Sequence, residues 1–309
     1  MRRFFLVALC APLLAQQTTN TYTTDLNGRT VAAGSYSVTK SGNTVTMTEQ
    51  TQSINGRTVP LMSTEERVIR EDSAGRVVER IIKRFDATGN PGPPEKQTIE
   101  EKKNTDGSVT AVTTVYRGDL NGRLQMAERT TAEGRKAGTT LTTNTVVEKP
   151  GMNGSLDVAE RQTLVSTDDA GKTQSNLTVF RKDSTGRFAE AFRVVTSADE
   201  QNGRRVENVA QYELNDAGKL NLASQTVIRA RKNPDGSESR EVDIYRAVPG
   251  LLNTSGKPVL YERQVIEQRK QGERIVETTA VQRPSINDPN RLSAPQKIGE
   301  RVCNGPNCK

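Results

Sequence analysis

Four segments that begin 32 residues apart read GRLQMAERTT (122–131), GSLDVAERQT (154–163), GRFAEAFRVV (186–195) and GKLNLASQTV (218–227). Each segment opens with Gly, has Leu or Phe two places later and Ala five places later. A fifth copy, GKPVLYERQV, begins at Gly256 after an insertion around 249–253. Matched residues at a period of this size are typical of stacked supersecondary units whose apolar residues bury one another.

Turn signals separate these segments along the whole chain. Asp119, Asp183 and Asn215 each stand three residues before a Gly. The Asp or Asn side chain can accept hydrogen bonds from the turn backbone, and Gly takes the positive φ that closes a type I turn with a bulge. The segments between turns are rich in Val, Thr, Ile, Arg and Glu, which predicts strands of about 12 residues joined as hairpins, about 16 strands in all.

The expected fold is all-β, a long antiparallel meander of repeated hairpins with a unit of about 32 residues. We expect the sheet to be elongated and twisted, or to form an open β-solenoid. Residues 1–15 are predicted to be a signal peptide, 16–283 the hairpin-repeat domain, and 284–309 a Pro-containing tail that ends in a Cys pair.

The N-terminus has the features of a secretory signal. Arg2 and Arg3 precede an almost wholly apolar run from residue 4 to residue 14, and Ala15 is a small residue at the expected cleavage site. Leu9 disfavours the alternative of a lipid anchor on Cys10, because a smaller residue normally precedes such a site. We therefore expect a secreted chain, periplasmic or extracellular, and no membrane span, since no other apolar run approaches about 20 residues.

Several chemistries lack their usual residues. The 309 residues include no His and no Trp, 33% are hydrophobic and 4% aromatic. Without His, the Ser-His-Asp and Cys-His arrangements are impossible and the commonest metal ligand is missing. We predict no enzyme activity, no cofactor and no metal. A glycosidase-like carboxylate pair stays open, and turn capping explains Asp168, Asp169 and Asp216 better than calcium binding does.

Charged residues are interleaved along the strands. Glu128-Arg129 and Glu160-Arg161 are adjacent pairs, and neighbouring residues of a strand point to opposite faces. Both faces of the sheet should therefore be wet for part of its width, with a narrow apolar row near the repeated Leu and Phe. The formal net charge of +7 forms no basic stripe, so nucleic acid is not an expected partner.

Aromatic residues recur nine residues after a Gly, as Tyr116, Phe180, Tyr212 and Tyr245. They are candidates for stacking against a ligand such as a sugar ring. The alternative is that they form cross-strand pairs or the core of the repeat. Val147 also lies nine residues after a Gly and cannot stack on a sugar, which favours the structural interpretation.

The C-terminal sequence Cys303-Asn-Gly-Pro-Asn-Cys308 predicts a disulfide in an oxidising compartment. A disulfide to another molecule is the alternative.

The spacing Tyr116-Arg-Gly-Asp119 and Phe180-Arg-Lys-Asp183, each followed by a Gly-Arg turn, resembles the YD repeats of the RHS family, and Phe85-Asp86 is a tighter version. The resemblance covers about half of the chain. It implies a secreted or surface protein built as a winding sheet of hairpins, and the C-terminal toxin or processing domain of that family has no counterpart here.

Together these features predict a secreted or periplasmic interaction or scaffold protein without catalytic activity, with an envelope protein or a glycan as its partner. A carbohydrate-binding adhesin is one alternative. An outer-membrane β-barrel is another, but the Glu-Arg pairs and the low aromatic content do not supply its outward apolar band and aromatic girdles.

Overall fold

The computed structural model describes residues 17–24, 29–41, 45–54, 56–119, 121–215, 217–247, 258–272, 274–285 and 291–304. Within these ranges the structure contains 18 β-strands and no helix, and all 18 strands belong to one antiparallel sheet. The strands are β1 (Gln17–Thr24), β2 (Thr30–Ser41), β3 (Val45–Ile54), β4 (Arg57–Asp72), β5 (Gly75–Arg84), β6 (Glu95–Lys103), β7 (Val109–Gly118), β8 (Leu124–Ala137), β9 (Thr140–Pro150), β10 (Leu156–Asp169), β11 (Lys172–Lys182), β12 (Phe188–Gln201), β13 (Arg204–Leu214), β14 (Leu220–Lys232), β15 (Glu238–Arg246), β16 (Val259–Gln271), β17 (Arg274–Gln282) and β18 (Gln296–Asn304).

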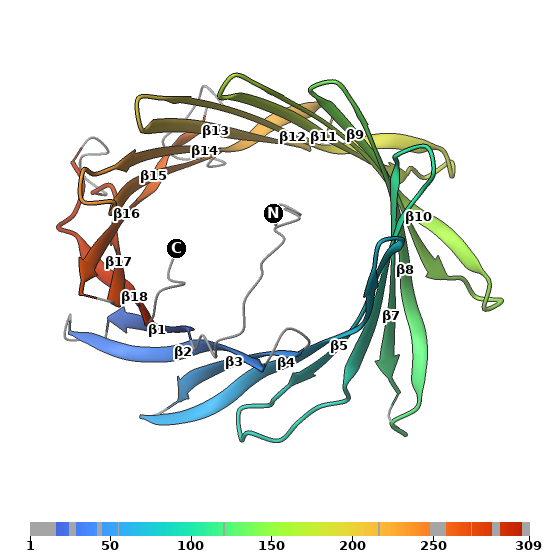
Figure 1. The fold of residues 1–309 in the computed structure, drawn as a ribbon, viewed down its shortest axis with the longest axis horizontal. Helices are drawn as coiled ribbons and strands as arrows, with labels where there is room; N and C mark the ends of the chain where they lie inside the picture. Colours follow the sequence, from blue (N-terminus) through green and yellow to red (C-terminus); the bar gives the residue numbers. More distant parts are fainter. Residues whose placement is uncertain are drawn as a thin grey trace.

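The sheet closes on itself, and Figure 1 shows the resulting ring of strands. Each strand pairs with its neighbours in the chain, and β1 also pairs with β18, where Thr19 lies opposite Arg301. The predicted all-β antiparallel meander of hairpins is confirmed. The predicted elongated sheet or open solenoid is wrong, because the two terminal strands form a ladder with each other and the protein is a closed 18-stranded barrel.

The turns form as their residue types predict. At the β11–β12 turn, the Gly186 amide donates to the Asp183 carbonyl (3.0 Å) and the Asp183 amide donates to the Arg187 carbonyl (2.8 Å). The Asp183 carboxylate accepts from the Thr185 amide at 2.8 Å, and Gly186 has φ of 82°. The Thr185 hydroxyl, followed by the Arg187 amide, holds the pKa of the Asp183 carboxyl below its ordinary value.

A ring of β-bulges lies near one end of the barrel, which we call the bulged rim. It is the end at which β7 joins β8, β9 joins β10, β11 joins β12 and β13 joins β14. In these hairpins the extra residue on the second strand is Ala127, Ala159, Ala191 or Ala223. In other hairpins the equivalent register shifts leave one residue of the second strand unpaired: Ala33, Leu61, Tyr261 or Ile298.

The bulges explain why Ala recurs five residues after Gly in the repeat. A bulge bends its strand and increases the local twist. Closed barrels use such bends to turn the sheet back on itself. The repeated Ala therefore contributes to closure as well as to the hairpin.

Closure predicts that cysteines at positions 19 and 301 become cross-linked. In a protein whose native cysteines are replaced by Ser, Thr19→Cys with Arg301→Cys should form an intramolecular disulfide under mild oxidation, since these residues lie directly opposite each other. Thr19→Cys with Glu277→Cys is the matched control, because Glu277 lies one strand further away, opposite Arg301. Two strand spacings are about 9.6 Å, too far for a disulfide. Non-reducing electrophoresis after proteolysis reads out both, and an open sheet would leave both pairs reduced.

Candidate functional site

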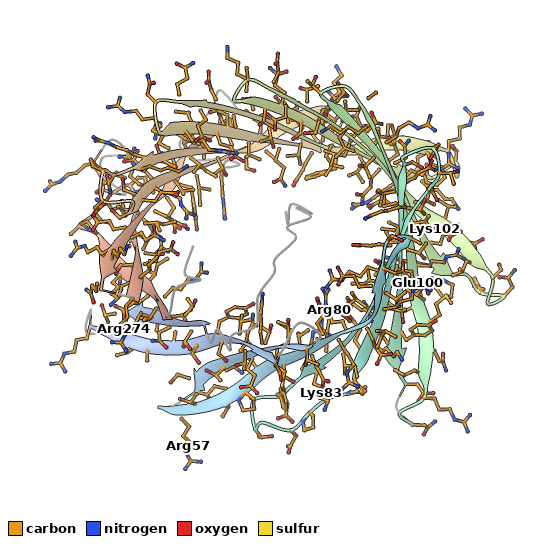
Figure 2. The ribbon with its side chains drawn as sticks, viewed as in Figure 1. Arg57, Arg80, Lys83, Glu100, Lys102 and Arg274 are labelled. Carbon is orange, nitrogen blue, oxygen red and sulfur yellow. The ribbon has the colours of Figure 1, made fainter. Side chains whose placement is uncertain are left out.

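The two faces of the barrel wall can be assigned from side-chain alternation. Figure 2 shows Arg80 on the inner side of the wall and Lys83 and Glu100 on the outer side. Residues directly opposite each other on neighbouring strands share a face, so the register carries this assignment around the ring. Arg80, for example, lies opposite Glu66 of β4.

Burial agrees with this assignment. The buried hydrophobic side chains all fall on the inner, or lumenal, face: Val78, Val115, Val179, Val194, Ala198 and Val281. The concave face of a curved sheet brings neighbouring side chains together, whereas the convex face spreads them apart. The lumen of an 18-stranded barrel is nevertheless too wide for side chains to fill.

Ion pairs encircle much of the lumen next to the bulged rim. This lumenal charged ring consists of Arg84, Glu95, Arg117, Glu128, Lys149, Glu160, Arg181, Glu262 and Arg283. Glu95 lies 3.1 Å from Arg117, and Glu160 lies 2.7 Å from Arg181. Burial raises the pKa of Glu95, but hydrogen bonds from Gln97 and Arg117 outweigh it and hold that pKa below its ordinary value.

Apolar residues, interspersed with Thr, Gln and the ion-paired Arg80, follow the charged ring deeper in the lumen. This lumenal apolar band runs from β5 to β17 and consists of Val78, Ile82, Ile99, Val115, Val147, Leu164, Leu177, Val179, Phe192, Val194, Val209, Ile228, Val242, Ile244, Ile266 and Val281. Leu164 lies opposite Leu177, which lies opposite Val194. The band is an arc, since the lumenal positions of β1 to β3 include Thr19, Tyr36 and Gln50.

The outer face is mixed at the same height, with polar and charged side chains beside Val165 and Val195. On β11 the lumenal positions include Leu177 and Val179, whereas the outer positions between and beside them are Asn176 and Thr178. Outer positions elsewhere carry Arg129, Arg161, Arg193 and Arg263. The adjacent Glu and Arg of the repeat do lie on opposite faces, as the sequence predicts, with Glu in the lumen and Arg outside.

The repeated Leu and Phe do not bury one another. Leu124, Leu156, Phe188 and Leu220 lie on the outer face beside the bulged rim, and Leu124 is 45% exposed. The Arg161 guanidinium lies 4.5 Å from the centre of the Phe188 ring. The narrow apolar row expected near these residues is thus displaced, and the buried apolar side chains lie in the lumen.

The candidate stacking residues Tyr116, Phe180, Tyr212 and Tyr245 all lie on the outer face. Phe180, Tyr212 and Tyr245 stand on alternate strands, about 9.6 Å apart, whereas Tyr116 stands four strands before Phe180. Each has a different strand neighbour, so they form separate half-buried contacts instead of one platform. Their structural equivalent on β9 is Glu148, because Val147 faces the lumen opposite Glu160. Counting nine residues from the preceding Gly therefore equates Val147 with the aromatic positions wrongly, by one residue. Gly138 is the first residue of its two-residue turn, whereas Gly171 is the second residue of its turn.

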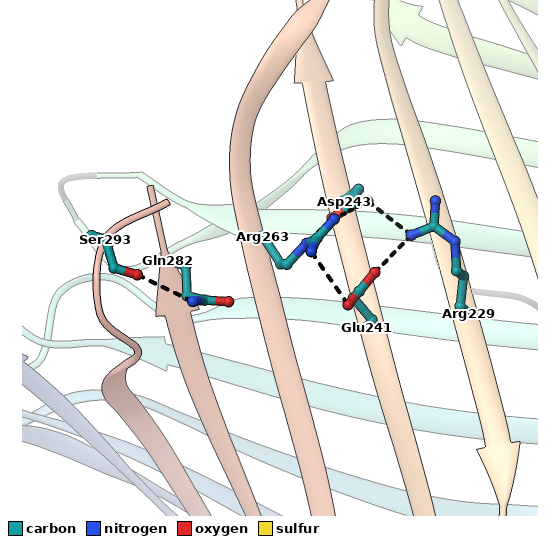
Figure 3. A network of polar contacts seen from close by, with 6 residues as sticks. All are labelled: Arg229, Glu241, Asp243, Arg263, Gln282 and Ser293. Atoms are coloured by element: carbon teal, nitrogen blue, oxygen red, sulfur yellow. Dashed lines mark hydrogen bonds and ion pairs between the residues drawn. The ribbon is translucent and has the colours of Figure 1, made fainter. Parts of the chain in front are cut away.

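The densest polar cluster on the outer face surrounds Asp243 of β15 (Figure 3). Arg263 donates to both carboxylate oxygens at 2.6 and 3.0 Å, and Arg229 donates to one at 2.8 Å. Glu241 accepts from Arg229 at 2.8 Å and lies 3.5 Å from Arg263. Asp243 is 0% exposed. Burial raises the pKa of Asp243, but the hydrogen bonds from Arg263 and Arg229 outweigh it, so the pKa lies below its ordinary value.

The turn carboxylates cap their own turns. Asp86, in the motif that resembles a YD repeat, accepts from the amides of Thr88 and Asn90. The Thr88 hydroxyl, followed by the Asn90 amide, lowers the pKa of Asp86 to about 2. Among the described residues, no cluster of His, Cys, Asp or Glu could hold a metal ion.

Several predictions concern parts of the chain outside the described residues. They include the signal peptide at 1–15, the Cys303–Cys308 disulfide through Cys308, and Asp216. These remain predictions.

Comparison with known proteins adds no family. No family model matches the chain, and no curated protein matches it. No helix in the described part of the chain is long and apolar enough to span a membrane. The resemblance to YD repeats therefore stays a prediction, and the functional interpretation must come from the two faces of the barrel.

The network around Asp243 predicts a large effect from a small change. Asp243→Asn removes a fully buried charge that holds two guanidinium groups, and should lower the free energy of unfolding by about 1.5–3 kcal/mol. Glu241→Gln is the matched control: Glu241 contacts the same two Arg side chains but is 37% exposed, so its loss should cost less than about 1 kcal/mol. Urea denaturation measures both, and equal losses would contradict this account.

The contribution of Asp243 to stability is also predicted to depend on pH. Because the pKa of Asp243 is lowered on folding, its contribution is fully present above the unfolded value of about 3.9 and is lost as pH falls through the folded value. The stability difference between wild type and Asp243→Asn should therefore shrink below about pH 4. A difference that stays constant down to acid unfolding would show that the charge of Asp243 is not responsible.

Proposed function

We propose that the protein is an extracytoplasmic β-barrel without catalytic activity that acts through its lumen, where it binds apolar ligands. The observation that carries this proposal is the difference between the two faces. The buried apolar side chains all lie in the lumen, whereas the outer face at the same height carries Asn176, Thr178 and Arg193 beside the exposed Val165 and Val195. The expected export of the chain places this activity in the periplasm or outside the cell.

The exposed surface of the chain is large for its mass, which supports a ligand that covers part of the wall. The chain exposes 21005 Å². A compact monomer of 33.9 kDa is expected to expose about 12,800 Å². The excess follows from a wall one sheet thick, which leaves both faces uncovered. Because exposed apolar surface costs about 25 cal/mol per Å², an apolar ligand in the lumen is favoured over water.

A closed barrel fits poorly with a scaffold that grows by adding strands. Closure leaves no sheet edge with unpaired backbone groups for a partner strand. The ring of 18 strands matches the alternative of an outer-membrane barrel better than it matches an open scaffold. An outer-membrane barrel is therefore the second candidate.

The outer face distinguishes the two candidates. A membrane-spanning barrel is apolar outside and polar inside. Here Arg129, Arg161 and Arg193 lie outside, and each Arg at the bilayer midplane would cost about 2–4 kcal/mol. The aromatic row Tyr116, Phe180, Tyr212 and Tyr245 is a single partial belt, not two girdles. We therefore place the apolar ligand inside the barrel and water outside it.

Carbonate extraction tests this choice. Treatment of the native envelope fraction with alkaline carbonate should release the protein into the supernatant, because its outer face is polar. A protein that stays in the pellet until detergent is added would support the outer-membrane candidate and contradict ours. A genuine outer-membrane barrel from the same cells is the control for complete retention.

Binding of the uncharged fluorophore N-phenyl-1-naphthylamine tests the lumen directly. The wild-type protein should give a saturable rise in fluorescence. Leu164→Asn with Leu177→Asn, two half-buried residues opposite each other in the lumen, should weaken binding by roughly tenfold or more, because an apolar contact of each Leu is lost.

The matched control is Val165→Asn with Val195→Asn. Val165 lies on β10, the strand of Leu164, and Val195 lies on β12. Both lie opposite Asn176 on the outer face, and they are 39% and 37% exposed. The control should bind the fluorophore as the wild type does. Equal losses in both variants, or no saturable binding in the wild type, would refute a lumenal apolar site.

A further inference from the structure

We infer that the ligand of the lumen is a phospholipid, with its acyl chains on the lumenal apolar band and its phosphate at the lumenal charged ring. This inference rests on the proposed function and names the class of ligand. It depends on how the two lumenal features are ordered along the strands and on which charges of the ring are exposed.

Charge and apolar surface follow each other along single strands. On β11 the lumenal side chains, read from the bulged rim, are Arg181, Val179 and Leu177. On β7 they begin with Arg117 and Val115. Successive lumenal residues are about 6.6 Å apart along a strand. A ligand that touches both features must therefore have a polar head joined directly to an apolar body, as an amphiphile has.

The exposed charges of the ring are cations. In three ion pairs the Arg side chain is far more exposed than its carboxylate partner. The exposed fractions are 66% for Arg117 and 8% for Glu95, and 63% for Arg181 and 18% for Glu160. In the third pair they are 61% for Arg283 and 13% for Glu262. Each carboxylate is largely covered and pairs with its guanidinium, while most of each Arg side chain stays exposed. Arginine binds phosphate oxygens through its planar fork of donors, so the ring favours a phosphate group over an ammonium group.

The outer face holds its guanidinium groups more closely, and Arg229, which contacts the buried Asp243, is 45% exposed. Arg193 is held by both oxygens of Glu190 at 2.7 and 2.9 Å, and Arg161 lies against the Phe188 ring. Outside, Leu124 and Leu156 lie at the bulged rim, and apolar residues further along the strands, such as Val165 and Val195, flank the polar Asn176. Among the described residues, the lumen combines the more exposed of these Arg side chains with the buried apolar side chains.

Lipid uptake from mixed vesicles tests the inference. The full-length protein is incubated with vesicles that contain dioleoylphosphatidylglycerol and dioleoylglycerol in equal amounts, re-isolated by gel filtration, and analysed for bound lipid by mass spectrometry. The two lipids share acyl chains and differ in the phosphate-bearing head. The wild type should carry the phospholipid in at least about tenfold excess, since charge-assisted hydrogen bonds from Arg to the phosphate are made by only one of the two lipids. Equal amounts of the two lipids would overturn the inference.

Matched variants locate the phosphate. Arg117→Gln with Arg181→Gln and Arg283→Gln changes the ring, and should remove the preference for phospholipid while binding of N-phenyl-1-naphthylamine persists. Arg129→Gln with Arg161→Gln and Arg193→Gln makes the same change outside and should keep the preference. Loss of the preference in the outer variant, or its retention in the ring variant, would overturn the assignment of the phosphate.

The outcomes separate this inference from the proposed function. If N-phenyl-1-naphthylamine binds to the lumen but the two lipids bind equally, the lumen is an apolar site without head-group recognition and only the phospholipid assignment fails. If neither lipid nor the fluorophore binds, the proposed function fails as well. Should the ring variant not fold, as judged by circular dichroism, the preference of the wild type between the two lipids still decides the inference.

Discussion

The backbone ladder between β1 and β18 is the interaction on which the rest of the structure depends. The wall is one sheet thick, and within the described residues no helix or second sheet packs against either face. Without this ladder, two long strands would expose unpaired amide and carbonyl groups, which invite association with other chains. By closing the barrel, the ladder also creates the lumen. The bulges near one rim supply the bends that bring the first and last strands together.

Curvature makes the two faces of the wall physically different. In a flat sheet with this sequence, alternating residues would be about equally exposed on both sides. In the barrel, Val194 on the concave side is 2% exposed while its neighbour Val195 on the convex side is 37% exposed. Closure therefore turns a weak alternation in sequence into a lumen with apolar surface. Polar networks compensate on the convex side, where Asp243 is buried by the guanidinium groups that it binds.

The sequence is sufficient for the local structure and for the strand alternation, but not for closure. Turn residues such as Asp183 and Gly186 set the hairpins, and adjacent Glu and Arg are correctly placed on opposite faces. Two local errors have a physical cause: the repeated Ala is a bulge residue, and Gly138 occupies the first turn position, which shifts Val147 into the lumen. Whether 18 strands close depends on the summed twist and bending of every hairpin, so no single motif encodes it. The lumenal site could not be predicted for the same reason, since only closure decides which face is concave.

A lumen of this kind couples ligand binding to stability. Few side chains of the described residues are fully buried, so the folded state gains less from burial than a compact protein of this size does. A ligand that covers the lumenal apolar band adds the contacts that a second layer would supply in a β-sandwich, and stabilises the folded state in proportion to RT ln(1 + [L]/Kd). The same alternation of residues would give the opposite result in a membrane, where lipid surrounds the barrel and water fills it. Because Arg161 and Leu164 lie on opposite faces of one strand, only one of these surroundings can suit the barrel. The charge outside and the apolar surface inside are the reason for proposing that the lipid lies within.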